Sequence, residues 1–122
     1  LEFSITPILC VSDLSQLDDY LSVSQIFKEN SQKIIFVYEP PSAISGGLDY
    51  HPEDVNTVLK NVEAIKNIVG TEAPVLYGGS VNKEVIGEFI KKSAINGVLV
   101  GKASLDPEEF VEISKNLAST VL

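Results

Sequence analysis

The stretch KIIFVYEPPSAISGG, Lys33–Gly47, decides the fold class because it joins a continuous apolar run to a loop of turn-forming residues. The run Ile34–Val37 is typical of a strand in a parallel sheet that is covered on both faces. One carboxylate, Glu39, follows this run almost directly and precedes two prolines. A glutamate in this place is either a solvated strand end or a base beside a binding loop, and this stretch alone leaves both interpretations open.

The rest of the chain repeats this arrangement of a short apolar run, small or turn-forming residues, and a helical pattern. Strands separated by helices favour right-handed crossovers and a parallel sheet. The predicted fold is therefore α/β, with four βα units in one domain that covers residues 1–122. The predicted strands are Pro7–Val11, Lys33–Tyr38, Pro74–Tyr77 and Gly97–Gly101, and the predicted helices lie within Leu14–Glu29, from about Pro52 to Val69, after the cap Asn82, and from Asp106 onward.

Composition narrows the range of partners. A formal charge of −8 disfavours nucleic acid and anionic membranes, and no apolar run approaches the roughly 20 residues that span a bilayer. We therefore expect a soluble, cytoplasmic protein. The single cysteine, Cys10, lies in a predicted strand and is expected to be a small buried hydrophobe. Neither a nucleotide-binding glycine motif nor metal-ligand spacing is found, so no cofactor and no metal is expected.

Candidate site residues follow the predicted strands, since ligands of parallel α/β folds bind at the carboxyl ends of the strands. These residues are Ser12–Asp13, Glu39 with its loop, Gly78–Ser80 and Gly101–Ser104. Glycines let backbone N–H groups approach a ligand closely, so two such turns on neighbouring strands can cradle a phosphate. Each turn alone is weak evidence.

Three segments together resemble the triosephosphate isomerase family. YEPPSAISGG resembles its catalytic loop, LYGGSVN its seventh strand and loop, and GVLVGKASLDPEEF its eighth strand and final helix. More weakly, PILCVSD resembles the fifth strand, which carries a cysteine in that family. A complete (β/α)8 barrel of this kind has eight units in roughly 250 residues. The resemblance thus implies half of a TIM barrel, its last four βα units.

The resemblance also implies roles for individual residues. Glu39 would be the base that moves a proton between two carbons of a triose phosphate. The phosphate would bind the backbone N–H groups of Ser45, Gly101 and Lys102, and both the N–H and the hydroxyl of Ser80. The lid would be the loop Pro40–Gly47, comprising Pro40, Pro41, Ser42, Ala43, Ile44, Ser45, Gly46 and Gly47.

Several positions depart from the family pattern. Pro41–Ser42 stands where an aliphatic residue and a tryptophan are common, Ser45 replaces a glycine, and Lys102 replaces the second glycine of the last loop. The Cβ of Lys102 would crowd a phosphate, whereas its ammonium would help to bind one. The family's substrate-binding Asn and Lys and its electrophilic His belong to units that this chain does not match. His51 is expected to be a surface or capping residue.

Three hypotheses remain at this point. The first is a triosephosphate isomerase half-barrel that is inactive or nearly so alone; the second is a non-catalytic phosphate-binding or self-associating structural half-barrel. The third is an open flavodoxin-like sheet, which four βα units also satisfy. A half-barrel leaves two strand edges unpaired, near Cys10 and Val98–Val100. Its expected partners are a triose phosphate or phosphate ion, further copies in a dimer or tetramer, or a complementing N-terminal half.

Overall fold

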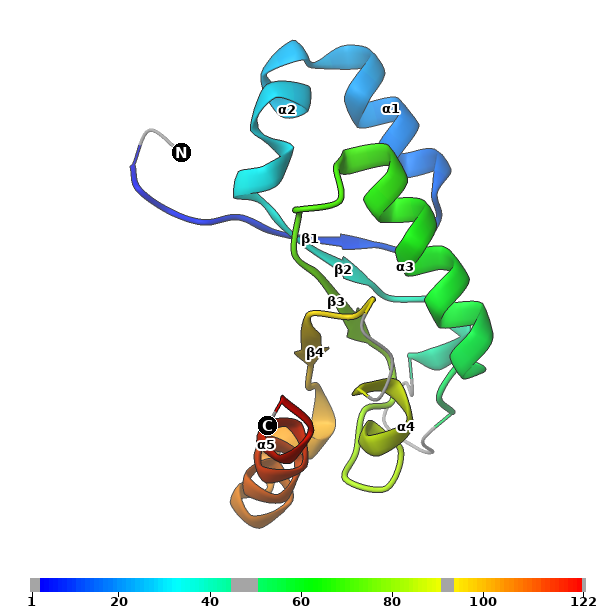
Figure 1. Cartoon of the computed structure of the whole chain (residues 1–122), viewed down its shortest axis with the longest axis vertical. Helices are drawn as coiled ribbons and strands as arrows, with labels where there is room; N and C mark the ends of the chain where they lie inside the picture. The colour runs from blue at the N-terminus through cyan, green and yellow to red at the C-terminus, as the bar shows by residue number, and fades with distance from the viewer. Residues whose placement is uncertain (1–2, 45–50, 91–93, 122) are drawn as a thin grey trace.

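The computed structural model describes residues 3–44, 51–90 and 94–121, and it shows one parallel sheet with helices between the strands (Figure 1). The predicted residues Ser45, Gly46 and Gly47 lie outside these ranges. The strands are β1 (Ile8–Val11), β2 (Ile35–Tyr38), β3 (Val75–Gly78) and β4 (Gly97–Leu99). The helices are α1 (Ser15–Val23), α2 (Gln25–Asn30), α3 (Val55–Val69), α4 (Ile86–Ile90) and α5 (Pro107–Val121), with short 3-10 turns η1 (Ser31–Lys33), η2 (Pro41–Ala43) and η3 (Lys102–Leu105).

The order of the strands excludes the flavodoxin-like alternative. All three strand pairs are parallel, and the sheet order β1-β2-β3-β4 follows the chain order. A flavodoxin-like sheet needs a point where the strand order reverses, and the described strands contain none. Sequential order is what four consecutive units of a barrel have. The chain is therefore α/β, with the topology of half a TIM barrel.

Local capping explains most helix boundaries. Asn82 accepts from the N–H of Val85 at 3.0 Å, as expected of the cap before α4, and Asp106 accepts from the N–H of Glu108 at 2.9 Å at the start of α5. The helix expected from about Pro52 begins later, at Val55, because Asp54 is its cap and accepts from the N–H of Thr57.

The first predicted helix is divided in two. Within Leu14–Glu29, the backbone of Ser24 is extended, and its hydroxyl accepts from the N–H of Phe27 at 3.1 Å. Ser24 therefore ends α1 and caps α2, which a serine does readily because its side chain competes with the helical backbone for hydrogen bonds.

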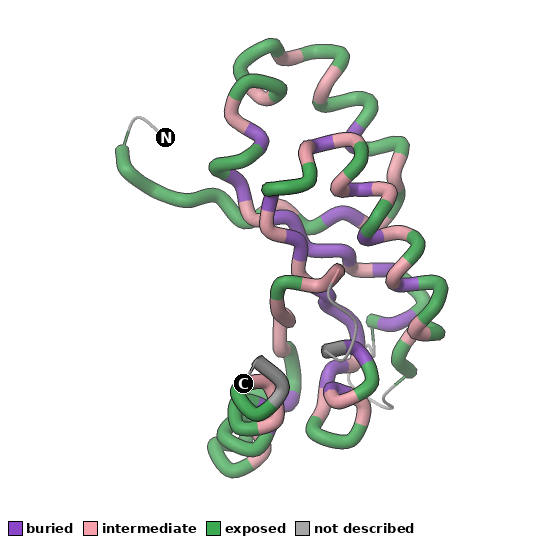
Figure 2. The backbone as a smooth tube through the Cα atoms, in the orientation of Figure 1, coloured by how far each residue is buried: buried purple, intermediate pink, exposed green. Residues whose placement is uncertain are grey.

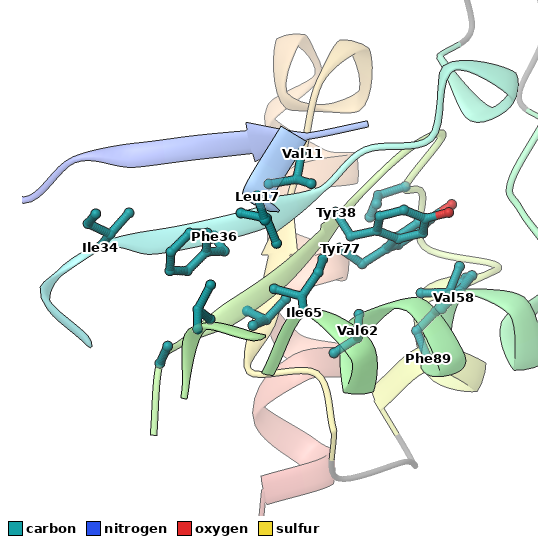
Figure 3. Close-up of a cluster of buried hydrophobic side chains, with 14 of the residues drawn as sticks. Val11, Leu17, Ile34, Phe36, Tyr38, Val58, Val62, Ile65, Tyr77 and Phe89 are labelled. Carbon is teal, nitrogen blue, oxygen red and sulfur yellow. The ribbon is translucent and has the colours of Figure 1, made fainter. Parts of the chain in front are cut away.

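The core lies between the sheet and its helices. Phe36, Tyr38 and Tyr77 of the strands face Val62 and Ile65 of α3 (Figure 3), and all five side chains are buried. Ile86 and Phe89 of α4 and Ile113 of α5 extend the same cluster. The burial colours follow this division: purple is concentrated on the inner strands β2 and β3 and recurs along α3, whereas β1 and β4 are mostly green or pink (Figure 2). In the described part of the chain, no helix is long and apolar enough to cross a membrane.

The side chains that alternate with this core set point to the opposite face of the sheet. They do not belong to the helix-packed cluster, and we call them the open face: Ile8, Cys10, Ile35, Val37, Leu76 and Leu99. Ile8 is 56% exposed at the edge strand β1, whereas Val37 in the inner strand β2 is fully buried. The expectation that Cys10 is buried is wrong, because β1 is an edge strand and Cys10 is exposed on it.

Candidate functional site

Of the site residues predicted from sequence, Glu39, Ser80, Gly101 and Lys102 line one cleft at the carboxyl ends of the strands, whereas Ser12–Asp13 do not line it. Glu39 directly follows β2, and its N–H donates to the carbonyl oxygen of Val11 at 2.9 Å, which continues the β1–β2 ladder by one residue. The backbone that carries the carboxylate is therefore held by the sheet and not by a loose loop.

A cleft of about 200 Å³ lies beside this carboxylate. Its walls come from the segment after β2, the turn after β3 and the turn after β4. Of the predicted site residues it contains Glu39, Ser80, Gly101 and Lys102, and the predicted lid residues Ala43 and Ile44 form another part of the wall. Three segments that sequence reasoning assigned separately thus line one cleft.

Glycine is required at one wall of this cleft. Gly79 has φ +151°, and a Cβ there would lie 2.8 Å from the Cβ of Ala43 and 2.9 Å from the hydroxyl oxygen of Tyr77. At Gly78 the tightest neighbour of an added Cβ would be Cγ1 of Val37 at 3.1 Å, whereas Oε1 of Glu39, at 3.6 Å, would be in ordinary van der Waals contact. Gly79 therefore lets the turn after β3 approach the segment after β2 closely.

Ser80 joins the two ends of the segment that follows β2. Its hydroxyl donates to the carbonyl oxygen of Ala43 at 2.8 Å and accepts from the N–H of His51 at 2.9 Å. Its φ of 47° is unusual for a residue other than glycine. The Ser80 hydroxyl already has two protein partners, so a phosphate that bound it would have to share or replace them. His51 is exposed, and it contributes its backbone N–H here.

The electrostatics of the site connect β1 with β2. Partial burial, the negative charge of Glu39 and a hydrogen bond to that carboxylate together raise the pKa of the Cys10 thiol. Cys10 also pairs with Val37 in the β1–β2 register, two residues before Glu39. The exposed cysteine is thus an immediate neighbour of the candidate base.

Sequence reasoning named Ser42 only as part of the predicted lid and missed Glu53, its polar partner behind the cleft. The Ser42 hydroxyl donates to Oε2 of Glu53 at 2.9 Å, and the N–H of Glu53 donates to the hydroxyl oxygen of Tyr77 at 3.2 Å. Burial is the main cause that raises the pKa of Tyr77, and the charge of Glu53 adds to it. The departure from the family pattern at Ser42 was the one available signal, and it did not identify the partner.

The described residues contain no cluster of three His, Cys, Asp or Glu side chains that could hold a metal ion. A second cleft, of about 490 Å³, is lined by residues from the segments 82–84 and 102–109. An ion pair of 3.3 Å between Lys83 and Glu109 is part of its wall. Lys102 is the residue that lines both clefts.

Comparison with known proteins gives a consistent match. The family model described as triosephosphate isomerase matches residues 1–117. The triosephosphate isomerase of Mycoplasmopsis agalactiae is 37% identical over 122 residues, which cover 92% of this chain and 46% of that protein. That of Aquifex aeolicus is 37% identical over 128 residues, covering 93% of this chain and 52% of that protein. The triosephosphate isomerase of Dictyoglomus thermophilum is 42% identical over 94 residues, which cover 73% of this chain and 38% of that protein. The chain thus spans about half the length of the first two relatives.

Proposed function

Since the chain belongs to the triosephosphate isomerase family, we propose that it carries the base and the phosphate-binding part of that enzyme's site. Glu39 is the proposed base, and the turns at Ser80 and at Gly101–Lys102 are the proposed phosphate cradle. The observation that supports this most is their meeting in one cleft, together with Ala43 and Ile44. The proposed ligand is a phosphorylated triose or a free phosphate ion.

The proposed chemistry is proton transfer between two neighbouring carbons and between their oxygens. Glu39 would take the proton from the carbon next to the substrate carbonyl, and the electron pair would move onto the carbonyl oxygen to give an enediolate. A proton would then pass from the hydroxyl oxygen of the first carbon to this oxyanion, and Glu39 would return its proton to the former carbonyl carbon. This interconverts glyceraldehyde 3-phosphate and dihydroxyacetone phosphate. The developing oxyanion requires preorganised donors, and losing one typically costs about 10²–10³ in rate. The chain spans about half the length of these relatives, and it does not match the units that carry the family's substrate-binding Asn and Lys and its electrophilic His. We therefore propose that the chain alone is inactive or nearly so.

The second candidate is a non-catalytic half-barrel that binds phosphate or associates with itself. The open face favours association, since Ile8 and Cys10 are exposed and neither β1 nor β4 has a second strand neighbour in the described sheet. Unpaired edges and exposed apolar surface both promote pairing with another chain. The proposed partners are further copies, in a dimer or tetramer, or a complementing N-terminal half.

Titration with inorganic phosphate, followed by NMR of the ¹⁵N-labelled chain, tests the cradle. We expect saturable shifts of the Ser80, Gly101 and Lys102 amides at millimolar phosphate, with sodium chloride at equal ionic strength as the control. Lys102→Gln should weaken binding by roughly three- to tenfold if the ammonium contacts the anion. Lys102→Gly should bind more tightly than the wild type if the lysine Cβ crowds the site. Absence of shifts in these amides contradicts the proposed phosphate site.

A further inference from the structure

We infer that Glu53 is a positioning residue for the Glu39 cleft. The segment that it positions is η2, whose last residue, Ala43, and the following Ile44 form part of the cleft wall. Glu53 itself is not part of that wall and precedes α3 by two residues. Its significance for ligand binding rests on the proposed function, whereas its effect on η2 does not.

The first step of the argument is how Glu53 is itself held. Its backbone N–H donates to the hydroxyl of Tyr77, whose side chain is fully buried and stacks on Phe89 with ring centroids 4.6 Å apart. The hydroxyl of Tyr77 therefore holds the backbone of Glu53 against the core. Residue 54 then caps α3, so that Glu53 lies between a core contact and a helix start. Little freedom is left for its backbone.

The second step is the contact that Glu53 makes with η2. Its Oε2 atom accepts from the hydroxyl of Ser42 at 2.9 Å. A hydrogen bond to a carboxylate is stronger than one between neutral groups. Ser42 is also the position where the family commonly has a tryptophan, so the large ring that would pack there is replaced by a small polar contact. Ser42 is exposed, and the carboxylate of Glu53 is the protein acceptor of its hydroxyl.

The third step is that η2 is held from two sides. Ser42 is tied to Glu53, and the carbonyl of the next residue, Ala43, accepts from the hydroxyl of Ser80. Ala43 is fully buried, and its Cβ occupies the space that a side chain at Gly79 would need. If the contact with Glu53 is removed, the bond from Ser80 is the one side-chain hydrogen bond of the described residues that still holds η2. The Ala43–Ile44 wall should then become less ordered.

Hydrogen exchange of two amides reports on this order without any ligand. The N–H of Ala43 donates to the carbonyl of Pro40 at 2.9 Å, and that of Ile44 donates to Pro41 at 3.3 Å, so both bonds close η2. We expect Glu53→Ala and Ser42→Ala each to speed exchange of these amides by about tenfold, the loss of one charge-assisted hydrogen bond. The double variant should exchange no faster than either single variant, because both remove the same contact.

Glu53→Gln separates a hydrogen bond from a general effect of charge, because its amide oxygen still accepts from Ser42 and should restore slow exchange. Glu63→Ala, an exposed glutamate on α3, is the matched control and should leave exchange unchanged. The inference would be overturned if the Ala43 and Ile44 amides exchanged at the wild-type rate in both Glu53→Ala and Ser42→Ala. Additive effects on the exchange rate in the double variant would overturn it as well. If Glu53→Ala does not fold, Ser42→Ala and Glu53→Gln still give the answer.

Phosphate titration of the same variants adds the functional readout. Glu53→Ala and Ser42→Ala should weaken phosphate binding, and Glu53→Gln should bind as the wild type does. If the wild type binds no phosphate, the proposed function fails, while the exchange data still test whether Glu53 orders η2. If the wild type binds phosphate and Glu53→Ala binds equally well despite faster exchange, the role of Glu53 in positioning the cleft is rejected and the proposed function stands.

Discussion

Cys10 of β1 lies beside Glu39, the residue that follows β2, and the charge of this carboxylate contributes to raising the pKa of the Cys10 thiol. The two strands are adjacent and parallel, and the N–H of Glu39 is bonded to Val11, the residue after Cys10. Backbone pairing thus places the thiol beside the proposed base. This neighbour relation allows the state of Glu39 to be followed through the reactivity of the chain's single cysteine.

The first prediction concerns alkylation of Cys10. The pKa of its thiol is raised above the ordinary value of 9.0, by burial first and then by the charge and hydrogen bond of Glu39. The reactive thiolate is therefore scarce at pH 8. Glu39→Gln removes the negative charge and should speed the reaction with iodoacetamide at this pH. Glu63→Gln on α3 is the control, and equal rates in wild type and Glu39→Gln would contradict the predicted coupling.

The second prediction compares two glycines. Gly79→Ala should reduce the free energy of unfolding by about 3 kcal/mol, because the backbone is strained for an alanine and the added Cβ overlaps Ala43 and Tyr77. Gly87→Ala is the matched control, since its Cβ would meet nothing within 4 Å and it lies in α4. Gly87→Ala should leave the free energy of unfolding unchanged or raise it by about 0.5–1 kcal/mol. Urea unfolding measures both, and similar values for the two variants would show that the turn after β3 tolerates a side chain.

The third prediction is a loss of stability in alkali. Burial raises the pKa of Tyr77, and likewise that of Tyr38, above the ordinary 10.0. Below pH 10 both states keep these protons, so the tyrosines add no pH dependence. As the pH rises above 10, the unfolded chain releases them first, and the free energy of unfolding falls until the folded groups ionise too. Tyr77→Phe should make this fall shallower. An unaltered slope in Tyr77→Phe refutes the assignment.

The fourth prediction concerns self-association. The chain should form a dimer or higher even-numbered oligomer at micromolar concentration, because its open face and strand edges are unpaired. Leu76→Glu places a charge on the open face and should shift the population toward monomer in light scattering. Val111→Glu, on an exposed position of α5, should not. A stable, folded wild-type monomer at that concentration argues against association.

The fifth prediction concerns isomerase activity. In a coupled assay with glyceraldehyde 3-phosphate, the chain alone should show little or no turnover, because a homo-oligomer supplies no Asn, Lys or His of the expected kind. Addition of the complementing N-terminal half should restore turnover, and Glu39→Gln should abolish it. Near-normal turnover by the wild-type chain alone, lost in Glu39→Gln, would show that a half-site suffices.

The local parts of the fold were predictable from sequence. Asn82 and Asp106 cap their helices through bonds to residues two and three positions away, so the pattern of residue types already contains both partners. The position of Glu39 after a buried strand was also predictable, because the apolar run that precedes it is continuous in the sequence. The division of the first helix at Ser24 is local as well, but a serine is compatible with either a helix interior or a cap. The helical pattern of that segment therefore did not indicate the break.

Tertiary structure alone decided the strand order, the exposure of Cys10 and the contacts behind the cleft. Whether β1 is an edge strand depends on which strands are its neighbours, and the apolar pattern of a strand does not contain that information. Ser42 meets Glu53 across 11 positions, Tyr77 meets Glu53 across 24, and Ala43 meets Ser80 across 37. Such pairs form only when the sheet brings distant turns to one edge. The sequence thus determined the βα units and the candidate base, whereas chain packing determined what surrounds that base.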